Sequence, residues 1–461
     1  MSKHHINYKK IDTGRLSVIT TIFLPVLIET ALSSFYGVID MMMVGKYDAN
    51  GLAAIGLTSN PLSIFLSIFQ AINVGTTTLV AWNVGAKKMK DAQDVMRISL
   101  IMNLVSGLAM TVIGMLLSRP IVDFMGGKGE VAVLAIEYYD ILVVGTTFQA
   151  LTYSVTAAMR GAGLSKVPMM YNSFSNLLNV VGNWLLIDGK FGIPALGVIG
   201  AGYSTLISRI ICCLWALWYA FLSKGNGISF RNRYGTFRFS WKRVSQMLRI
   251  GIPSALENLI MNCGSMFYVK IVNSLGNAAF SAHQICNNVN SLTSAPSTAL
   301  NVTANTVIGQ YLGANEFDNA KKYKSYLCRI SLVISVVMGA VVILFAREIA
   351  GFYVKPGETE ILALTLPVFY ILVVQYITGH INGVVMGALR AAGDTQFALY
   401  LNSFAFLFFR IPLAYVFGVV CGWGLVGVWL SLIAHSWLNF AVISIRYRSG
   451  KWLGIYKKVN E

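Results

Sequence analysis

Long apolar runs, separated by short polar loops, cover nearly all of this 461-residue chain. A helix needs about 20 apolar residues to cross the hydrocarbon core of a bilayer. No segment shows the alternation of polar and apolar residues that a half-buried strand requires, so the runs predict helices. Twelve runs can be distinguished, at about 16–44, 53–82, 96–118, 132–158, 168–187, 196–222, 246–273, 279–311, 328–346, 361–388, 397–418 and 424–445.

The composition also indicates a membrane protein. Charged residues make up 12% of the chain and hydrophobic residues 56%, whereas soluble domains carry about 25% charged residues. The six cysteines form no CxxC pair and lie in or beside apolar runs, which argues against a disulfide framework or a zinc site. The basic N-terminus precedes an apolar run too long for a signal peptide, so we expect the first span to be retained. These features predict an all-α integral membrane protein.

The positive charge is concentrated on one side of the predicted membrane spans. The formal net charge is +17, and of the 36 lysines and arginines, 27 fall on the side that holds both termini and 6 on the other. Cytoplasmic loops carry an excess of lysine and arginine. We therefore expect a multi-pass plasma-membrane protein with both termini in the cytoplasm. Membrane topology then explains the excess positive charge, so we expect no nucleic-acid partner.

The chain contains an internal repeat. LPVLIETALSSF matches IPSALENLIMNC at an offset of 228 residues, and MRGAGLSKVPMMYNS matches LRAAGDTQFALYLNS at about 230. A third pair, ALGVIGAGYS and GWGLVGVWLS, follows near the end of each half. The equivalent polar residues are Glu29 and Glu257, Arg160 and Arg390, and Asn172 and Asn402.

The repeat predicts two lobes of six helices each. An even number of spans makes both halves enter the membrane in the same direction, so their pseudo-twofold axis lies along the membrane normal. We expect an N-terminal lobe at 1–222, a basic cytoplasmic linker at 223–245 and a C-terminal lobe at 246–461. Two lobes with a cleft between them suit alternating access, which favours a carrier over a receptor, a channel or an enzyme.

Three carboxylates in the predicted spans are candidate functional groups, because an ionised side chain in hydrocarbon is costly. Asp40 lies near the end of the first span, and Glu29 and Glu257 each lie one turn after a proline, Pro25 or Pro253. Each could bind a proton or a sodium ion. The alternatives are a partly solvated helix end for Asp40, and a structural link between a proline-kinked helix and neighbouring donors for the two glutamates.

The fifth span carries a polar stripe. Asn172, Asn176, Asn179 and Asn183 recur at spacings of four, three and four residues, which places them on one helical face. Amide oxygens can bind sodium, and Thr205 on the next span could contribute a hydroxyl. Hydrogen bonding between helices is the alternative interpretation.

Other polar and aromatic residues are candidates for a substrate cavity. The eighth span is unusually polar and contains His283 and Asn287, and His380 lies in the tenth span. Intramembrane histidines can carry protons or serve only in packing. Together with Glu29, aromatic residues such as Tyr36 and Tyr153 suit an amphipathic organic cation.

The sequence resembles the multidrug and toxic compound extrusion (MATE) family over nearly its full length. The resemblance rests on the two six-span halves and on the order and spacing of several segments. These are IDMMMVGK, GLAAIGL, TTTLVAWNVGAKKMKDA, AAMRGAGLSK, NAAFSAHQI and GALRAAGDTQ. It implies a rocker-type antiporter that exports organic cations or drugs in exchange for protons or sodium ions, with no cofactor.

The resemblance also implies site residues. The family's first-span aspartate aligns with Asp40, and its fifth-span pair aligns with Asn179 and Asn183, where the second position is an acid in many members. This implies a possible sodium site at Asp40, Asn179 and Asn183. The family's seventh-span glutamate aligns one turn from Glu257, which could serve from the same face. Its tenth-span acid aligns near His380 and is absent here.

Two other functions fit less well. A flippase for a lipid-linked saccharide precursor would share the fold, but we expect acidic or neutral residues in the cavity, which disfavours a pyrophosphate ligand. An integral membrane enzyme needs a catalytic constellation such as HExxH, and none occurs in the sequence. We therefore expect a monomeric carrier that lies in the lipid bilayer and binds small organic cations.

Overall fold

The computed structural model is helical throughout the part of the chain that it describes. Among those residues every regular element is a helix and none is a strand, which confirms the predicted all-α fold. The chain divides into two compact units, one ending at Ile252 and the other beginning at Pro253. The described residues are 17, 19–47, 49–192, 194–223, 227–231, 234–354 and 358–460.

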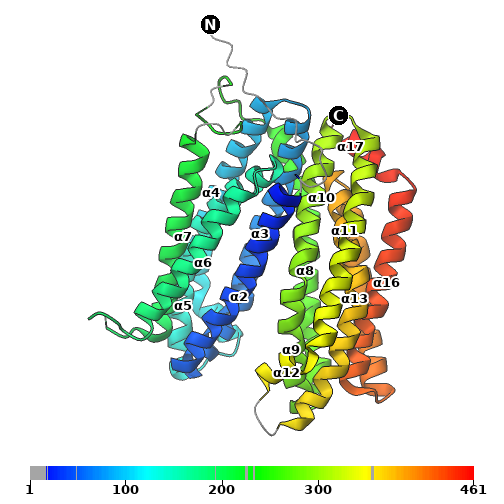
Figure 1. Ribbon diagram of the computed structural model, residues 1–461. Coiled ribbons are helices and arrows are strands. Elements are labelled where there is room, and N and C mark those ends of the chain that lie inside the picture. Colours follow the sequence, from blue (N-terminus) through cyan, green and yellow to red (C-terminus); the bar gives the residue numbers. More distant parts are fainter. Residues whose placement is uncertain are drawn as a thin grey trace. The chain divides into compact units, whose positions relative to one another are not determined.

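The N-terminal unit is built from six long helices, drawn from blue to green in Figure 1. Helix α5 packs against α3, α4 and α7, and α6 lies between α2 and α7. The first turns of α8 also belong to this unit. The elements are η1 (Ile19–Phe23, a π-helical turn), α2 (Leu24–Tyr47), α3 (Ala49–Gly85), α4 (Met89–Phe124), α5 (Gly129–Gly161), α6 (Lys166–Leu186), α7 (Gly197–Leu222) and α8 (Trp241–Asn273).

The C-terminal unit repeats the six-helix plan with more interruptions. Helix α13 is its centre and packs against α9, α10, α11 and α16. The elements after α8 are α9 (Asn277–Thr293), α10 (Ala295–Gly313), α11 (Phe317–Leu344), α12 (Ala346–Tyr353), α13 (Thr359–Ala391), α14 (Thr395–Phe404), η2 (Ala405–Arg410), α15 (Ile411–Tyr415), η3 (Val416–Val420), α16 (Gly424–Arg448) and α17 (Lys451–Asn460).

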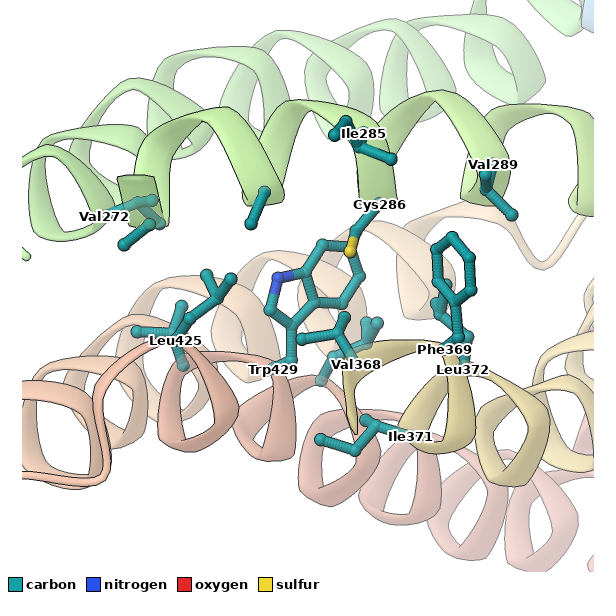
Figure 2. Close-up of a cluster of buried hydrophobic side chains, with 14 of the residues drawn as sticks. Val272, Ile285, Cys286, Val289, Val368, Phe369, Ile371, Leu372, Leu425 and Trp429 are labelled. Atoms are coloured by element: carbon teal, nitrogen blue, oxygen red, sulfur yellow. The ribbon is translucent and has the colours of Figure 1, made fainter. Parts of the chain in front are cut away.

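An apolar core holds this second unit together. Figure 2 shows Trp429 of α16 reaching toward Cys286 of α9, with Phe369 of α13 beside them. The indole side chain of Trp429 is only 1% exposed. Because the core draws side chains from seven helices, α8, α9, α11, α12, α13, α15 and α16, it fixes their mutual positions within the unit.

Most predicted spans agree with the observed helices to within about five residues, but α4 begins seven residues earlier than predicted and α11 eleven residues earlier. Both helices start with polar, charged turns that the apolar pattern does not include. Nine helices in the described part of the chain are long and apolar enough to span a membrane by length and composition alone. The exceptions are α6, which carries the asparagine stripe, α8, and the eighth predicted span. That span is two helices, because α9 ends at Thr293 and Pro296 lies in the first turn of α10, where a proline is well tolerated. The short helices α12 and α17 are not predicted by the apolar pattern.

The basic segment between the two units packs on the N-terminal unit. The Gln93 amide donates a hydrogen bond to the Ser229 carbonyl oxygen at 2.6 Å. Arg243 donates to the carboxylates of Asp91, at 2.6 Å, and Asp94, at 2.9 Å. We call the described residues of 227–243 the docked segment. It contacts the first turns of α4 and the last turn of α7, and the boundary between the compact units falls later, inside α8.

Candidate functional site

Asp40 lies in the N-terminal unit, where α2 meets α6. The side-chain amide of Asn183 donates a hydrogen bond to the Asp40 carboxylate. Asn183 is fully buried, and its own amide oxygen has no hydrogen-bond partner among the residues that the structure describes. Asp40 is only partly buried. The site therefore combines a half-buried negative charge with an unpaired, buried amide oxygen.

A second contact lies one helical turn away. The Asn179 amide donates to the Thr205 hydroxyl at 3.0 Å, and the Ser204 hydroxyl donates to the Asn179 carbonyl oxygen at 2.7 Å. Gly182 allows this close approach of α6 and α7, because a Cβ atom there would lie 2.4 Å from the Ser204 hydroxyl oxygen. The structure thus brings together four of the predicted ion-coupling residues, one or two from each of α2, α6 and α7.

The side chains of this region carry oxygens of mixed type. Asp40 supplies a carboxylate, Asn179 and Asn183 supply amide oxygens, and Thr205 supplies a hydroxyl. Within the described residues, no group of three His, Cys, Asp or Glu side chains could hold a metal ion. One carboxylate with neutral oxygens suits a proton or a hard monovalent cation better than a transition metal. We call these four residues the Asp40 site.

Glu29 takes part in a separate cluster on α2, α5 and α6. Its Oε1 atom accepts hydrogen bonds from Arg160 at 2.8 Å and from Asn172 at 2.7 Å. The Glu29 side chain is 7% exposed and that of Arg160 is 22% exposed. The carboxylate is therefore already neutralised by an arginine, which favours the structural interpretation of Glu29.

The C-terminal unit contains the same cluster. Glu257 of α8 accepts from Arg390 of α13 at 3.2 Å and from Asn402 of α14 at 2.6 Å. Asn439 of α16 donates in turn to the Asn402 oxygen at 3.1 Å. We call the two clusters the N-terminal and C-terminal triads. Glu257 belongs to the C-terminal triad and lies in the unit that does not contain the Asp40 site.

Of the other candidates, the histidines have partners inside the C-terminal unit. His380 contacts the Ser335 hydroxyl at 2.8 Å and the Thr293 carbonyl oxygen at 3.3 Å. Asn287 donates to Nε2 of His283 at 2.8 Å. Both histidine side chains are buried. His380 is held through both ring nitrogens, which is the arrangement expected of a packing residue.

The remaining polar and aromatic candidates lie in the N-terminal unit. Asn176 donates to the Ser33 hydroxyl at 3.0 Å, which ties α6 to α2. Tyr36 lies on α2 beside Phe35, with ring centroids 6.2 Å apart. Tyr153 of α5 is partly buried. None of these residues contacts the Asp40 carboxylate through a hydrogen bond in the described part of the chain.

Sequence reasoning did not assign roles to three arginines of the interior, Arg160, Arg390 and Arg410. Arg160 and Arg390 pair with the two glutamates, and the signal for these pairs was present, because both partners recur at nearly the same repeat offset. Arg410 lies in an apolar span with no acidic residue near it in sequence. A lone arginine in such a span is itself a signal of function.

Comparison with known proteins identifies the family. The sequence profile of the MatE family matches residues 25–185 and 253–416, which is well over half of the chain. The chain belongs to the MatE family. The two matched segments coincide with the two halves of the internal repeat. The protein is therefore a multi-pass membrane transporter rather than an enzyme.

Relatives of similar length support this assignment. An uncharacterized transporter of Bacillus subtilis, YisQ, is 27% identical, with 93% of each chain covered. A probable multidrug resistance protein NorM of Thermotoga maritima is 26% identical, over 93% of this chain and 91% of its own length. A NorM protein of Bacillus licheniformis, described in the same words, is 28% identical over 90% of this chain and 91% of its own.

Solved structures share the fold. One is the outward-facing conformation of a multidrug resistance MATE family transporter, with a TM-score of 0.89, 23% identity and 96% of each chain covered. Another is a MATE transporter in a bent conformation, with a TM-score of 0.86, 23% identity and 97% of each chain covered. At this identity the likeness establishes the arrangement of helices, including the two six-helix halves.

Proposed function

We propose that this protein exports amphipathic organic cations or drugs across the plasma membrane in exchange for protons or sodium ions. The observation that carries the proposal is the Asp40 site, where a half-buried carboxylate is bonded to a buried asparagine whose own oxygen is unpaired. Relatives of nearly the same length are named as probable multidrug resistance proteins. Because the triads already neutralise Glu29 and Glu257, Asp40 is the main ion-coupling residue of the proposal.

The proposed coupling depends on competition for one negative charge. A proton or a sodium ion at Asp40 neutralises the carboxylate, and an organic cation near it then loses its electrostatic partner. A ligand shifts a conformational equilibrium only through its different affinity for the two states. The ion and the drug therefore favour opposite orientations of a rocker-type carrier, which alternates access to the two sides of the membrane.

The neutral residues have defined parts in this proposal. Asn183 holds the Asp40 carboxylate, and its unpaired oxygen is a second ligand for a cation. Asn179 and Thr205 add oxygens one turn away. Aromatic faces such as those of Tyr36 and Tyr153 would contact the apolar part of the drug. The protein would act as a monomer in the lipid bilayer without a cofactor.

The test is efflux of ethidium from proteoliposomes under an imposed sodium gradient or an imposed pH gradient. Wild-type protein should drive efflux with one of the two gradients. Asp40→Asn should lose that efflux, because the amide cannot be ionised. Asp123→Asn is the matched control, since Asp123 is an exposed carboxylate near the end of α4, and it should retain wild-type efflux.

The outcomes separate the parts of the proposal. Efflux that survives in Asp40→Asn would exclude Asp40 as the coupling residue. Absence of ethidium efflux under both gradients, with folded protein in the vesicles, would contradict organic-cation export and favour the lipid-linked saccharide flippase. Loss of efflux in Asp123→Asn as well would mean that the Asp40 result reflects general damage.

A further inference from the structure

The C-terminal unit has a different charge at the position equivalent to the Asp40 site. At the repeat offset of 228 residues, Asp40 corresponds to Tyr268 of α8. The Tyr268 hydroxyl donates to the Val428 carbonyl oxygen at 3.0 Å, so its ring is fixed against α16. The Arg410 guanidinium lies over this ring, 4.6 Å from its centroid. An arginine therefore occupies a region where the first half has an aspartate.

The Arg410 side chain has aromatic partners but no acidic one. Its guanidinium also lies 5.2 Å from the centroid of the Phe406 ring. Within the described residues no carboxylate forms an ion pair with it, and its buried Nε atom has no hydrogen-bond partner. Rings that contact the faces of a guanidinium leave the N–H groups at its edge free to bind. An unpaired cation in a membrane helix is costly, which marks it as a functional candidate.

Among the described residues, two buried donors without partners belong to rings that follow on from Tyr268, the ring beneath Arg410: His283 contacts Tyr268, and Trp429 contacts His283. The Trp429 indole is 1% exposed and its Nε1–H group is unpaired. His283 is 2% exposed, and because Asn287 donates to its Nε2 atom, the ring hydrogen lies on Nδ1, which is also unpaired. The His283 ring centroid is 5.4 Å from that of Trp429 and 5.8 Å from that of Tyr268.

We propose that Arg410, Trp429 and His283 form a binding site for a monovalent anionic group, with the chemistry of a carboxylate, inside the C-terminal unit. We call these three residues the donor cluster. Each of the three side chains has an N–H group, and none has a negatively charged oxygen. The cluster therefore repels cations, and an anion would accept the hydrogen bonds that its N–H groups leave unmade. Figure 2 shows the Trp429 side chain among the helices of this unit, with its ring nitrogen drawn in blue.

The surroundings favour an organic anion over an inorganic one. The rings of Tyr268 and Phe406 contact the Arg410 guanidinium, so an aromatic body attached to the carboxylate would meet further apolar surface. Chloride carries the same charge but has no aromatic body that could contact this apolar surface. A carboxylate on a transported molecule and a free inorganic anion are therefore the two sources that the experiment must distinguish.

The experiment measures binding to the purified full-length protein in lipid nanodiscs by isothermal titration. The probes are sodium benzoate, sodium chloride and benzyl alcohol, which has the same ring without the charge. Wild-type protein should bind benzoate saturably and benzyl alcohol not at all. Arg410→Gln should weaken benzoate binding at least about tenfold, because it removes a charged donor. Trp429→Phe should weaken it less, because it removes one neutral N–H group.

Matched variants control for damage to the fold. Trp452→Phe alters another fully buried tryptophan, whose Nε1–H donates to the Tyr447 carbonyl oxygen, and should leave benzoate binding unchanged. Arg410→Lys keeps the charge and should retain more benzoate binding than Arg410→Gln. If Arg410→Gln does not fold, Trp429→Phe provides the second test. Chloride that binds at the same site and as tightly as benzoate would identify an inorganic anion as the occupant and confirm the donor cluster.

Two results would overturn the proposal. One is an absence of saturable binding of both benzoate and chloride to folded wild-type protein. The other is benzoate binding that both Arg410→Gln and Trp429→Phe leave unchanged. Because the readout is binding and the donor cluster lies apart from Asp40 in the chain, either result leaves the proposed cation export standing. A failure of ethidium efflux likewise leaves the anion site standing.

Discussion

At the scale of single residues, the interior of each unit contains a buried glutamate–arginine ion pair at an equivalent position of the repeat. The pairs Glu29–Arg160 and Glu257–Arg390 each receive a third partner, an asparagine amide that donates to the same carboxylate. Removing one member of a buried pair leaves an uncompensated charge, which costs far more than replacing both members. The triads are therefore structural elements. Removing one charged member should destabilise the unit, whereas removing both charges should destabilise it much less.

We expect Arg160→Met to lower the free energy of unfolding by about 3–5 kcal/mol, because Glu29 would be left charged and buried. The double variant Glu29→Gln with Arg160→Met should recover most of this loss, since no charge remains. Denaturant unfolding of the detergent-solubilised protein measures both. Arg119→Met, at an exposed site, is the control. A double variant no more stable than the single one would contradict a charge-based role.

At the scale of helices, close contacts are made possible by residues without side chains. Gly387 of α13 faces the Asn301 carbonyl oxygen of α10, and a Cβ atom there would lie 2.3 Å from that oxygen. Gly251 of α8 meets the Ala71 carbonyl oxygen of α3 in the same manner within the N-terminal unit. Small residues at such positions let membrane helices pack backbone to backbone.

Gly387→Ala should separate α10 from α13 and destabilise the C-terminal unit by about 1–3 kcal/mol, as overpacking of a tight core does. The obstacle is a backbone oxygen, which cannot move without shifting a helix. Gly351→Ala is the matched control, because a Cβ atom there meets nothing within 4 Å. The measurement is the midpoint of thermal unfolding. A shift of equal size in both variants would refute the packing argument.

The helices themselves could be predicted from the apolar pattern, and their contacts could not. The period and length of each run predict the spans, but the break between α9 and α10 within the single predicted run at 279–311 is not predicted. The pairing of Glu29 with Arg160 joins residues that are 131 positions apart, a separation about which helical periodicity carries no information. The internal repeat does carry information about this pairing, because the glutamate, the arginine and the asparagine of each triad recur at nearly the same offset. Arg410 has no repeat partner, so its aromatic surroundings appear only in three dimensions.

At the scale of the whole molecule, duplication has conserved structure and changed chemistry. Both units keep a glutamate–arginine–asparagine triad, yet Asp40 in one half corresponds to Tyr268 in the other. Of the asparagine stripe of α6, only Asn172 has an asparagine counterpart, Asn402. At the same offset of 230 residues the other three positions hold Phe406, Phe409 and Leu413, and η2 forms a π-helical turn there. The two halves are thus similar in their folding and different in what they can bind.

The distribution of lysine and arginine predicts how the chain is oriented in the membrane. Lys128 lies between α4 and α5 on the side expected to face outward, and Lys88 precedes α4 on the side expected to face the cytoplasm. A membrane-impermeant maleimide should therefore label Lys128→Cys in intact cells and Lys88→Cys only after permeabilisation. Wild-type protein gives the background from the native cysteines. The opposite labelling pattern would invert the expected topology.

The docked segment has a consequence for anyone who engineers this protein. The longest loop between two halves is the usual place to insert a reporter domain or to divide a chain into two separately expressed fragments, because exposed loops tolerate such changes. Here Ser229 is fully buried, and Arg243 contacts two aspartates. An insertion or a cut between these residues would pull apart contacts of the N-terminal unit. The loop that looks most dispensable in the sequence is therefore a poor site for either.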